Sequence, residues 1–136
     1  MLNVPVITLY LIDMKILVLG MGLMGPTIAK DCVEDPEVTK VTGCDIDKQK
    51  LDEALIYVNH PNFEVDEISV LDHDKLVEKM REYDLVIHGT SAKFSINVLR
   101  AAMEAKVNLV DLAGGGDPQE GRMYDEVKKA GIRSEE

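Results

Sequence analysis

A short glycine-rich segment near the start of the chain constrains its fold more than any other feature of the sequence. Residues 14–31 read MKILVLGMGLMGPTIAKD, in which Gly20, Gly22 and Gly25 have the spacing G-x-G-x-x-G directly after an apolar run. A continuous apolar run bounded by glycine is typical of a strand that is buried on both faces, and residues with helical spacing follow it. The segment therefore predicts a strand, a tight turn and a helix, which is the beginning of a β-α-β unit.

The rest of the chain continues the same alternation of strand and helix. Residues 15–20, 37–45, 63–70, 83–88 and 107–113 have the apolar or β-branched character of strands, and helical patterns separate them. A last helix is expected from Asp117, followed by proline, to Gly131. Because β-α-β crossovers are right-handed, we expect a doubly wound parallel α/β sheet of five strands, Rossmann-like, in the order 3-2-1-4-5. We expect the sixth strand of a complete two-halved domain to be absent.

The length and charge of the chain limit what it can bind. A chain of 136 residues is one domain, and we expect residues 14–136 to form it behind an extension of unknown role at 1–13. The net charge of −10 disfavours nucleic acid and an anionic membrane surface as partners. The apolar extension is too short to span a bilayer. Cys32 and Cys44 lack the spacing of a metal or redox pair, so we expect no metal site and a reduced, cytoplasmic setting.

An acidic residue at the right distance makes the glycine spacing specific for a dinucleotide. Asp45 lies 20 residues after Gly25, at the end of the second expected strand. Gly20 then allows the tight turn, Gly22 leaves room for the pyrophosphate, Gly25 allows close packing of helix and strand, and the helix N-terminus attracts the phosphates. Glycines that serve only a turn would explain neither the spacing nor the acid.

Asp45 also bears on the choice of cofactor. A carboxylate at this position can accept hydrogen bonds from both ribose hydroxyls but repels a 2′-phosphate, so we favour NAD over NADP. Lys48 and Lys50 are near in sequence and could partly offset that repulsion, although a solvated helix face explains them as well.

The end of the fourth expected strand is the second place where a cofactor could bind. Gly89 permits close approach, and Thr90 and Ser91 can hydrogen-bond a ribose or the nicotinamide, although Ser91 could equally cap the next helix. His88 is the histidine in the most suggestive position, and a buried, hydrogen-bonded imidazole is favoured over a catalytic one. Asp111, at the end of the fifth strand, is expected to face the same cleft or to anchor the glycines after it.

Three stretches of the chain resemble the N-terminal NAD(P)-binding domain of the saccharopine dehydrogenase family. They are MKILVLGMGLMGPTIAKDC, VTGCDIDKQKLDEA and YDLVIHGTSAKFSINVLRAAMEAKVNLVDLAG, and the resemblance covers about residues 14–132. It implies a pyridine-nucleotide oxidoreductase that acts on C–N bonds of amino acids or polyamines. It also implies which residues bind the cofactor: Gly20, Gly22, Leu23, Met24 and Gly25 the pyrophosphate, Asp45 and Ile46 the adenosine, Val70 and Leu71 the adenine, and Gly89, Thr90 and Ser91 the nicotinamide side.

The same resemblance leaves the chemistry outside the expected domain. Enzymes of the family continue into a substrate-binding and dimerising domain, so we expect this chain alone to bind the dinucleotide without a complete active site. Its partner would be a separate substrate-binding domain or a second copy of the chain. A stand-alone nucleotide-sensing regulatory domain, similar to those of potassium-transport systems, is the alternative, and a Rossmann scaffold that no longer binds nucleotide is the least favoured.

Overall fold

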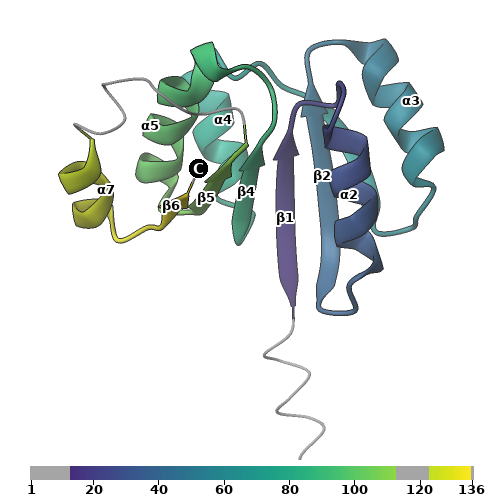
Figure 1. Cartoon of the computed structure of the whole chain (residues 1–136), viewed down its shortest axis with the longest axis horizontal. Coiled ribbons are helices and arrows are strands. Elements are labelled where there is room, and N and C mark those ends of the chain that lie inside the picture. The colour runs from purple at the N-terminus through teal and green to yellow at the C-terminus, as the bar shows by residue number, and fades with distance from the viewer. Residues whose placement is uncertain (1–12, 113–122, 136) are drawn as a thin grey trace, which may run out of the picture.

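The computed structural model describes residues 13–112 and 123–135, and its centre is a parallel sheet of six strands in the order β3-β2-β1-β4-β5-β6 (Figure 1). Every pair of neighbouring strands in it is parallel. The strands are β1 (Met14–Leu19), β2 (Val38–Asp45), β3 (Phe63–Glu67), β4 (Leu85–His88), β5 (Asn108–Asp111) and β6 (Ser134–Glu135).

Helices cover both faces of this sheet, as a doubly wound topology requires. One face carries α2 (Gly25–Glu34) and α3 (Lys48–Val58), and the other carries α4 (His73–Met80) and α5 (Ser95–Ala105) (Figure 1). A short 3-10 helix, η1 (Ala92–Phe94), leads into α5, and α7 (Tyr124–Ala130) packs on α5. The carboxylates of Asp47 and Asp72 accept backbone N–H groups at the starts of α3 and α4, which explains where these helices begin.

The core is divided into two layers by alternation along the strands. On β1, Leu17 and Leu19 face the α4 and α5 layer, whereas Ile16 and Val18 face the α2 and α3 layer. All four are at most 4% exposed, because a parallel sheet covered on both faces has no solvent side. The glycine turn after β1 and the segments after β2, β3 and β4 lie at the carboxyl edge of the sheet.

The doubly wound sheet and the order of its first five strands are confirmed, but the expected absence of a sixth strand is corrected. Two residues, Ser134–Glu135, pair in parallel with β5. The preceding residue supports the pairing: Arg133 O accepts the N–H of Leu109, and Arg133 N donates to Asn108 Oδ1. The sequence did not predict β6 because this strand is only two residues long and both side chains are exposed, so it has no apolar pattern.

Some boundaries also differ from those expected. β3 ends at Glu67 instead of residue 70, so Val70 lies in the turn before α4. The expected start of the last helix at Asp117 and nearly all of the N-terminal extension lie outside the described residues. No helix in the described ranges is both long and apolar enough to cross a membrane, and within the same ranges no group of three or more His, Cys, Asp or Glu residues is arranged to hold a metal ion.

Candidate functional site

The glycine turn after β1 is a place where backbone packs directly on backbone. Gly20 has a φ of +98°, and a Cβ there would lie 2.9 Å from the carbonyl carbon of Gly89. A Cβ at Gly25 would lie 1.8 Å from the carbonyl oxygen of Gly20. Side chains at these two positions would therefore collide with the turn itself or with the end of β4, and the first and third glycines of the motif are required by packing.

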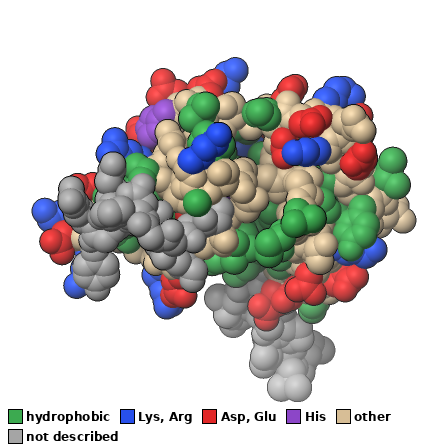
Figure 2. Space-filling model, turned by 45° about the horizontal axis from the view of Figure 1, so that its top comes forward, with side chains coloured by type: hydrophobic (Ala, Val, Ile, Leu, Met, Phe, Trp, Pro, Cys, Tyr) green, Lys and Arg blue, Asp and Glu red, His purple; other side chains and the backbone are tan. Residues whose placement is uncertain are grey.

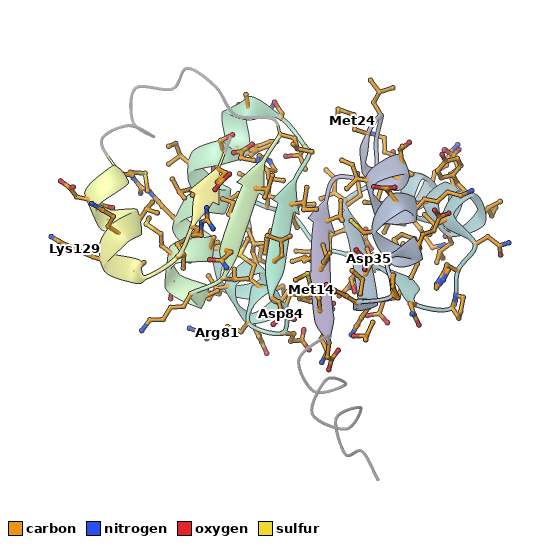
Figure 3. All side chains as sticks on the ribbon, turned by 60° about the horizontal axis from the view of Figure 1, so that its bottom comes forward. Met14, Met24, Asp35, Arg81, Asp84 and Lys129 are labelled. Carbon is orange, nitrogen blue, oxygen red and sulfur yellow. The ribbon has the colours of Figure 1, made fainter. Side chains whose placement is uncertain are left out.

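Gly22 differs from the other two glycines because its surroundings are open. A Cβ at this position would meet only Lys50 Nζ, at 3.9 Å. Leu23 and Met24, which follow it, are 97% and 54% exposed. Figure 3 shows Met24 at the opposite end of β1 from Met14, projecting away from the ribbon. Packing within the described residues therefore does not require a glycine at position 22, and the space above it is open to a ligand.

The start of α2 is suited to an anion. Its N-cap residue, Met24, makes no side-chain hydrogen bond to the first turn, and Pro26 occupies an early position that needs no N–H donor. Backbone N–H groups at such a helix start point outward, and the helix dipole adds a positive potential there.

Asp45 joins the end of β2 to the glycine turn. Its Oδ2 accepts the N–H of Met21 at 2.9 Å, and its Oδ1 accepts the N–H of Asp47 at 2.9 Å. Each carboxylate oxygen has two lone pairs, so both retain capacity for a further donor. The acid therefore holds the turn in place and still presents acceptors at the sheet edge.

A pocket of about 450 Å³ empty volume opens at the carboxyl edge of the sheet, beside Asp45. Figure 2 shows this edge of the molecule turned toward the viewer, with hydrophobic side chains exposed between charged ones. The wall combines the ends of β1 and β2 with the segment after β3 and the loop after β4, and it consists of Leu19, Cys44, Asp45, Ile46, Ile68, Ser69, Val70, Leu71, Thr90 and Phe94.

The pocket brings together five of the residues that the sequence singled out. They come from the end of β2, the turn before α4 and the loop after β4, and they are Asp45, Ile46, Val70, Leu71 and Thr90. The residues of the glycine turn do not line this pocket; Met21, Gly22 and Leu23 instead border a second hollow between α2 and α3, together with Lys50.

Four apolar lining residues of the pocket were not named as site residues from the sequence: Leu19, Cys44, Ile68 and Phe94. Leu19 and Cys44 stand at the ends of β1 and β2, so the rule that ligands bind at the carboxyl ends of strands could have found them. Phe94 gives no such signal, because its spacing to Val98 and Ala101 is equally that of an apolar stripe on a helix. Burial raises the pKa of the Cys44 thiol to about 12, and the nearby Asp66 carboxylate adds to the rise, so this cysteine is an apolar wall.

The loop after β4 places its three expected residues differently. Gly89 packs against the glycine turn and donates its N–H to Leu19 O at 2.8 Å. Thr90 reaches the pocket. Ser91 precedes η1 without a capping hydrogen bond from its side chain, so the alternative role as a side-chain cap is not realised.

Beneath this loop, His88 is fully buried between two polar partners. Its Nε2 lies 2.5 Å from Thr90 Oγ1, and its Nδ1 lies 3.2 Å from Asp111 Oδ1. Asp111 is opposite His88 in the register of β4 and β5. The expectation of a buried, hydrogen-bonded imidazole is confirmed. Asp111 is itself buried against the ring and does not line the pocket, so it does not face the cleft there as expected.

The two lysines after β2 have different surroundings. Lys48 Nζ pairs with Asp52 at 3.2 Å on the surface of α3. Lys50 makes no ion pair with the described residues and lies over the open side of Gly22. Of the two, Lys50 is therefore the cation available to a phosphate near the glycine turn.

A glycine turn clasped by an acid at the end of the second strand, in a doubly wound parallel sheet, defines a dinucleotide-binding α/β domain of the Rossmann type. Residues 16–132 match the family model described as the saccharopine dehydrogenase NADP binding domain. The chain belongs to this family. A nucleotide cofactor is thereby supported, whereas the preference for NAD over NADP stays a prediction.

Solved structures share the fold at low sequence identity. The apo saccharopine dehydrogenase (L-Glu forming) of Saccharomyces cerevisiae superimposes with a TM-score of 0.79 at 20% identity, over 89% of this chain and 26% of that one. AtPrR2 with NADP+ and (+)pinoresinol gives 0.67 at 19% identity, over 90% and 48%. The Bordetella bronchiseptica enzyme WbmG in complex with NAD gives 0.59 at 23% identity, over 73% and 37%. The chain thus spans about a quarter to a half of the length of these proteins.

Proposed function

We propose that this chain binds NAD(H) and is the nucleotide-binding part of a saccharopine dehydrogenase-like oxidoreductase. The reaction class is hydride transfer at a C–N carbon of an amino acid or polyamine, for which the bound dinucleotide supplies the hydride donor or acceptor. What this chain contributes is the binding and orientation of that cofactor. The match of residues 16–132 to the NADP binding domain of the saccharopine dehydrogenase family supports the nucleotide-binding part of this proposal.

One observation carries the cofactor assignment: the fold accounts for Gly20 and Gly25 but not for Gly22. The first and third glycines prevent collisions of backbone with backbone, whereas the second faces open space beside an uncapped helix start. A pyrophosphate needs that combination, because it must approach the backbone closely and accept N–H groups of the helix.

Each part of the cofactor is proposed to contact a different part of the site. The pyrophosphate lies over the turn and the start of α2, the adenosine beside the acid, the adenine in the apolar pocket and the nicotinamide half toward the loop after β4. The residues assigned to these parts are Gly20, Gly22, Leu23, Met24 and Gly25; Asp45 and Ile46; Val70 and Leu71; and Gly89, Thr90 and Ser91.

The proposed preference for NAD rests on Asp45. Its carboxylate is held at the edge of the pocket by two backbone N–H groups, where it can accept the ribose hydroxyls and repel a 2′-phosphate. Lys50 is the opposing influence, because its ammonium lies near the turn without a carboxylate partner among the described residues. The balance of these two groups sets the selectivity between the cofactors.

Calorimetric titration with NAD+ and with NADP+ tests both claims. We expect NAD+ to bind more tightly than NADP+, and Asp45→Ala to weaken NAD+ binding by roughly 1–3 kcal/mol, the scale for a lost buried acceptor. Asp47→Ala is the matched control, because it removes a neighbouring carboxylate that does not line the pocket. Absence of binding by either cofactor below about millimolar would contradict the function, and tighter binding of NADP+ would contradict the role of Asp45.

The substrate is proposed to be bound by another domain or another chain. We expect no turnover when the chain alone is incubated with NAD+ and either saccharopine or lysine, because the matched region is only 26% of the solved saccharopine dehydrogenase. Measurable formation of NADH under these conditions would show that the chain carries its own substrate site.

A further inference from the structure

A buried chain of polar groups runs from β5 to the mouth of the pocket. Asp111 lies 3.2 Å from Nδ1 of His88, and Nε2 of the same ring lies 2.5 Å from the hydroxyl of Thr90. The histidine is fully buried and Asp111 is 5% exposed, whereas Thr90 is exposed and lines the pocket. The threonine is thus the exposed end of a chain whose two other members are buried.

The two nitrogens of the imidazole have different partners, and this fixes where its proton resides. The contact with Asp111 has the distance of an ion pair but not the alignment of a hydrogen bond. A carboxylate oxygen can only accept, so it stabilises a proton on Nδ1. In the neutral ring Nε2 is then the acceptor, and the hydroxyl of Thr90 donates to it.

Protonation of the ring reverses this last hydrogen bond. Imidazolium carries a proton on both nitrogens, so Nε2 donates and Thr90 Oγ1 accepts. The hydrogen of the hydroxyl is then released and can be donated to another group. When the ring is neutral, the Thr90 hydroxyl can only accept a hydrogen bond from a ligand. When the ring is charged, the hydroxyl can donate one.

Thr90 stands where that difference would reach a ligand. A Cβ at Gly20 would lie 3.0 Å from Thr90 Cγ2, so the threonine touches the glycine turn. It also lines the pocket that contains Asp45. On the proposed function, on which this inference rests, Thr90 belongs to the loop on the nicotinamide side and also adjoins the turn that holds the pyrophosphate. The pyrophosphate oxygens accept hydrogen bonds and donate none.

We propose that His88 is a positioning residue that sets the polarity of the Thr90 hydroxyl, so that a protonated His88 turns Thr90 into a hydrogen-bond donor for the pyrophosphate of the dinucleotide. Asp111 lies against the other nitrogen of the ring, Nδ1. Protonation of His88 consequently raises the affinity for the dinucleotide.

Among the described residues, no other charged group faces His88 from the elements packed around it. The neighbouring residue on β1 is Leu19, and α5 turns Ser95, Val98 and Leu99 toward this half of the core. The buried residues of α4 are Leu76, Val77 and Met80. Asp111 on β5 is therefore the titratable group that accompanies His88.

Titration of NAD+ between about pH 5.5 and 8 tests the proposal, because the pyrophosphate of NAD+ does not change its charge there. We expect roughly tenfold tighter binding by the wild type at the acid end, the value of one hydrogen bond to a charged group. His88→Gln keeps an amide near the hydroxyl without titrating, and Thr90→Val removes the hydroxyl at nearly constant shape. Both should bind NAD+ with a flat pH profile, whereas Thr90→Ser should retain the slope.

A second readout uses the free protein and does not depend on cofactor binding. Nitrogen chemical shifts of the three histidines, with His88 assigned by its loss in His88→Gln, report which nitrogen carries the proton. We expect the Nδ1–H form in the neutral ring of the wild type. Neutral His88 protonated on Nε2 would overturn the inference, and so would a slope that persists in Thr90→Val. No binding of NAD+ or NADP+ at any pH would instead contradict the proposed function.

Discussion

Two alanine substitutions three residues apart should separate folding from ligand binding. In Gly22→Ala the new methyl group meets only Lys50 Nζ, at 3.9 Å, so the free energy of unfolding should be unchanged or raised by up to about 1 kcal/mol. In Gly25→Ala the methyl group lies 1.8 Å from the carbonyl oxygen of Gly20 and must move to at least 3.0 Å.

The cost at Gly25 can be estimated from what has to move. The colliding atom belongs to the backbone of Gly20, whose N–H donates a hydrogen bond to Cys44 O at 2.7 Å. A shift of Gly20 therefore also disturbs β2. Overpacking of this kind costs about 1–3 kcal/mol or more, and the better helix propensity of alanine recovers only up to about 1 kcal/mol. We therefore expect Gly25→Ala to lower the free energy of unfolding by about 2 kcal/mol.

Urea denaturation followed by circular dichroism measures the stabilities, and calorimetry with NAD+ measures the binding. Gly22→Ala should keep the slope of unfolding and retain or raise the midpoint. It should nevertheless lose at least tenfold in affinity, about 1.4 kcal/mol, because its methyl group occupies the approach of the pyrophosphate. Unchanged affinity of Gly22→Ala would refute the reasoning that this glycine serves a ligand. A fully stable Gly25→Ala would show that helix and turn are not in the close contact described.

Two further substitutions test the core beneath the site. Tyr83→Phe removes the 2.5 Å hydrogen bond between the hydroxyls of Tyr83 and Thr42. The free energy of unfolding in urea should fall by about 0.5–1.5 kcal/mol, because Thr42 keeps Glu64 as a partner. A loss of about 3 kcal/mol would mean that Thr42 loses that partner as well. The raised pKa of the Cys44 thiol, 9.0 in the unfolded chain and about 12 when folded, stabilises the fold fully below pH 9, and this contribution is lost as the pH rises toward 12. The unfolding free energy of the wild type should thus fall relative to that of Cys44→Ala by about 1 kcal/mol per pH unit above pH 9, and parallel curves for the two proteins would contradict a buried thiol.

The fold was predictable because its signals are local. The apolar run before Gly20 and the acidic residue Asp45 are each recognised from a few neighbouring residues, and both stand where they were expected. The short strand β6 was missed because its pairing depends on backbone contacts of Arg133 with β5, which leave no pattern in the side chains. Phe94 could not be recognised as a pocket residue, because nothing in its spacing shows that the chain tightens into a 3-10 turn there.

The sequence by itself determined the glycine spacing, the acid at the proper distance and the alternation of strands and helices, and hence the type of sheet and the edge at which a ligand is expected. Only the tertiary structure decided that Gly22, unlike its two neighbours in the motif, has no packing role. It also decided that His88 lies between Asp111 and Thr90. The physical reason is that these relations join residues from different strands and loops, and their distances follow from how the sheet packs and not from any local pattern.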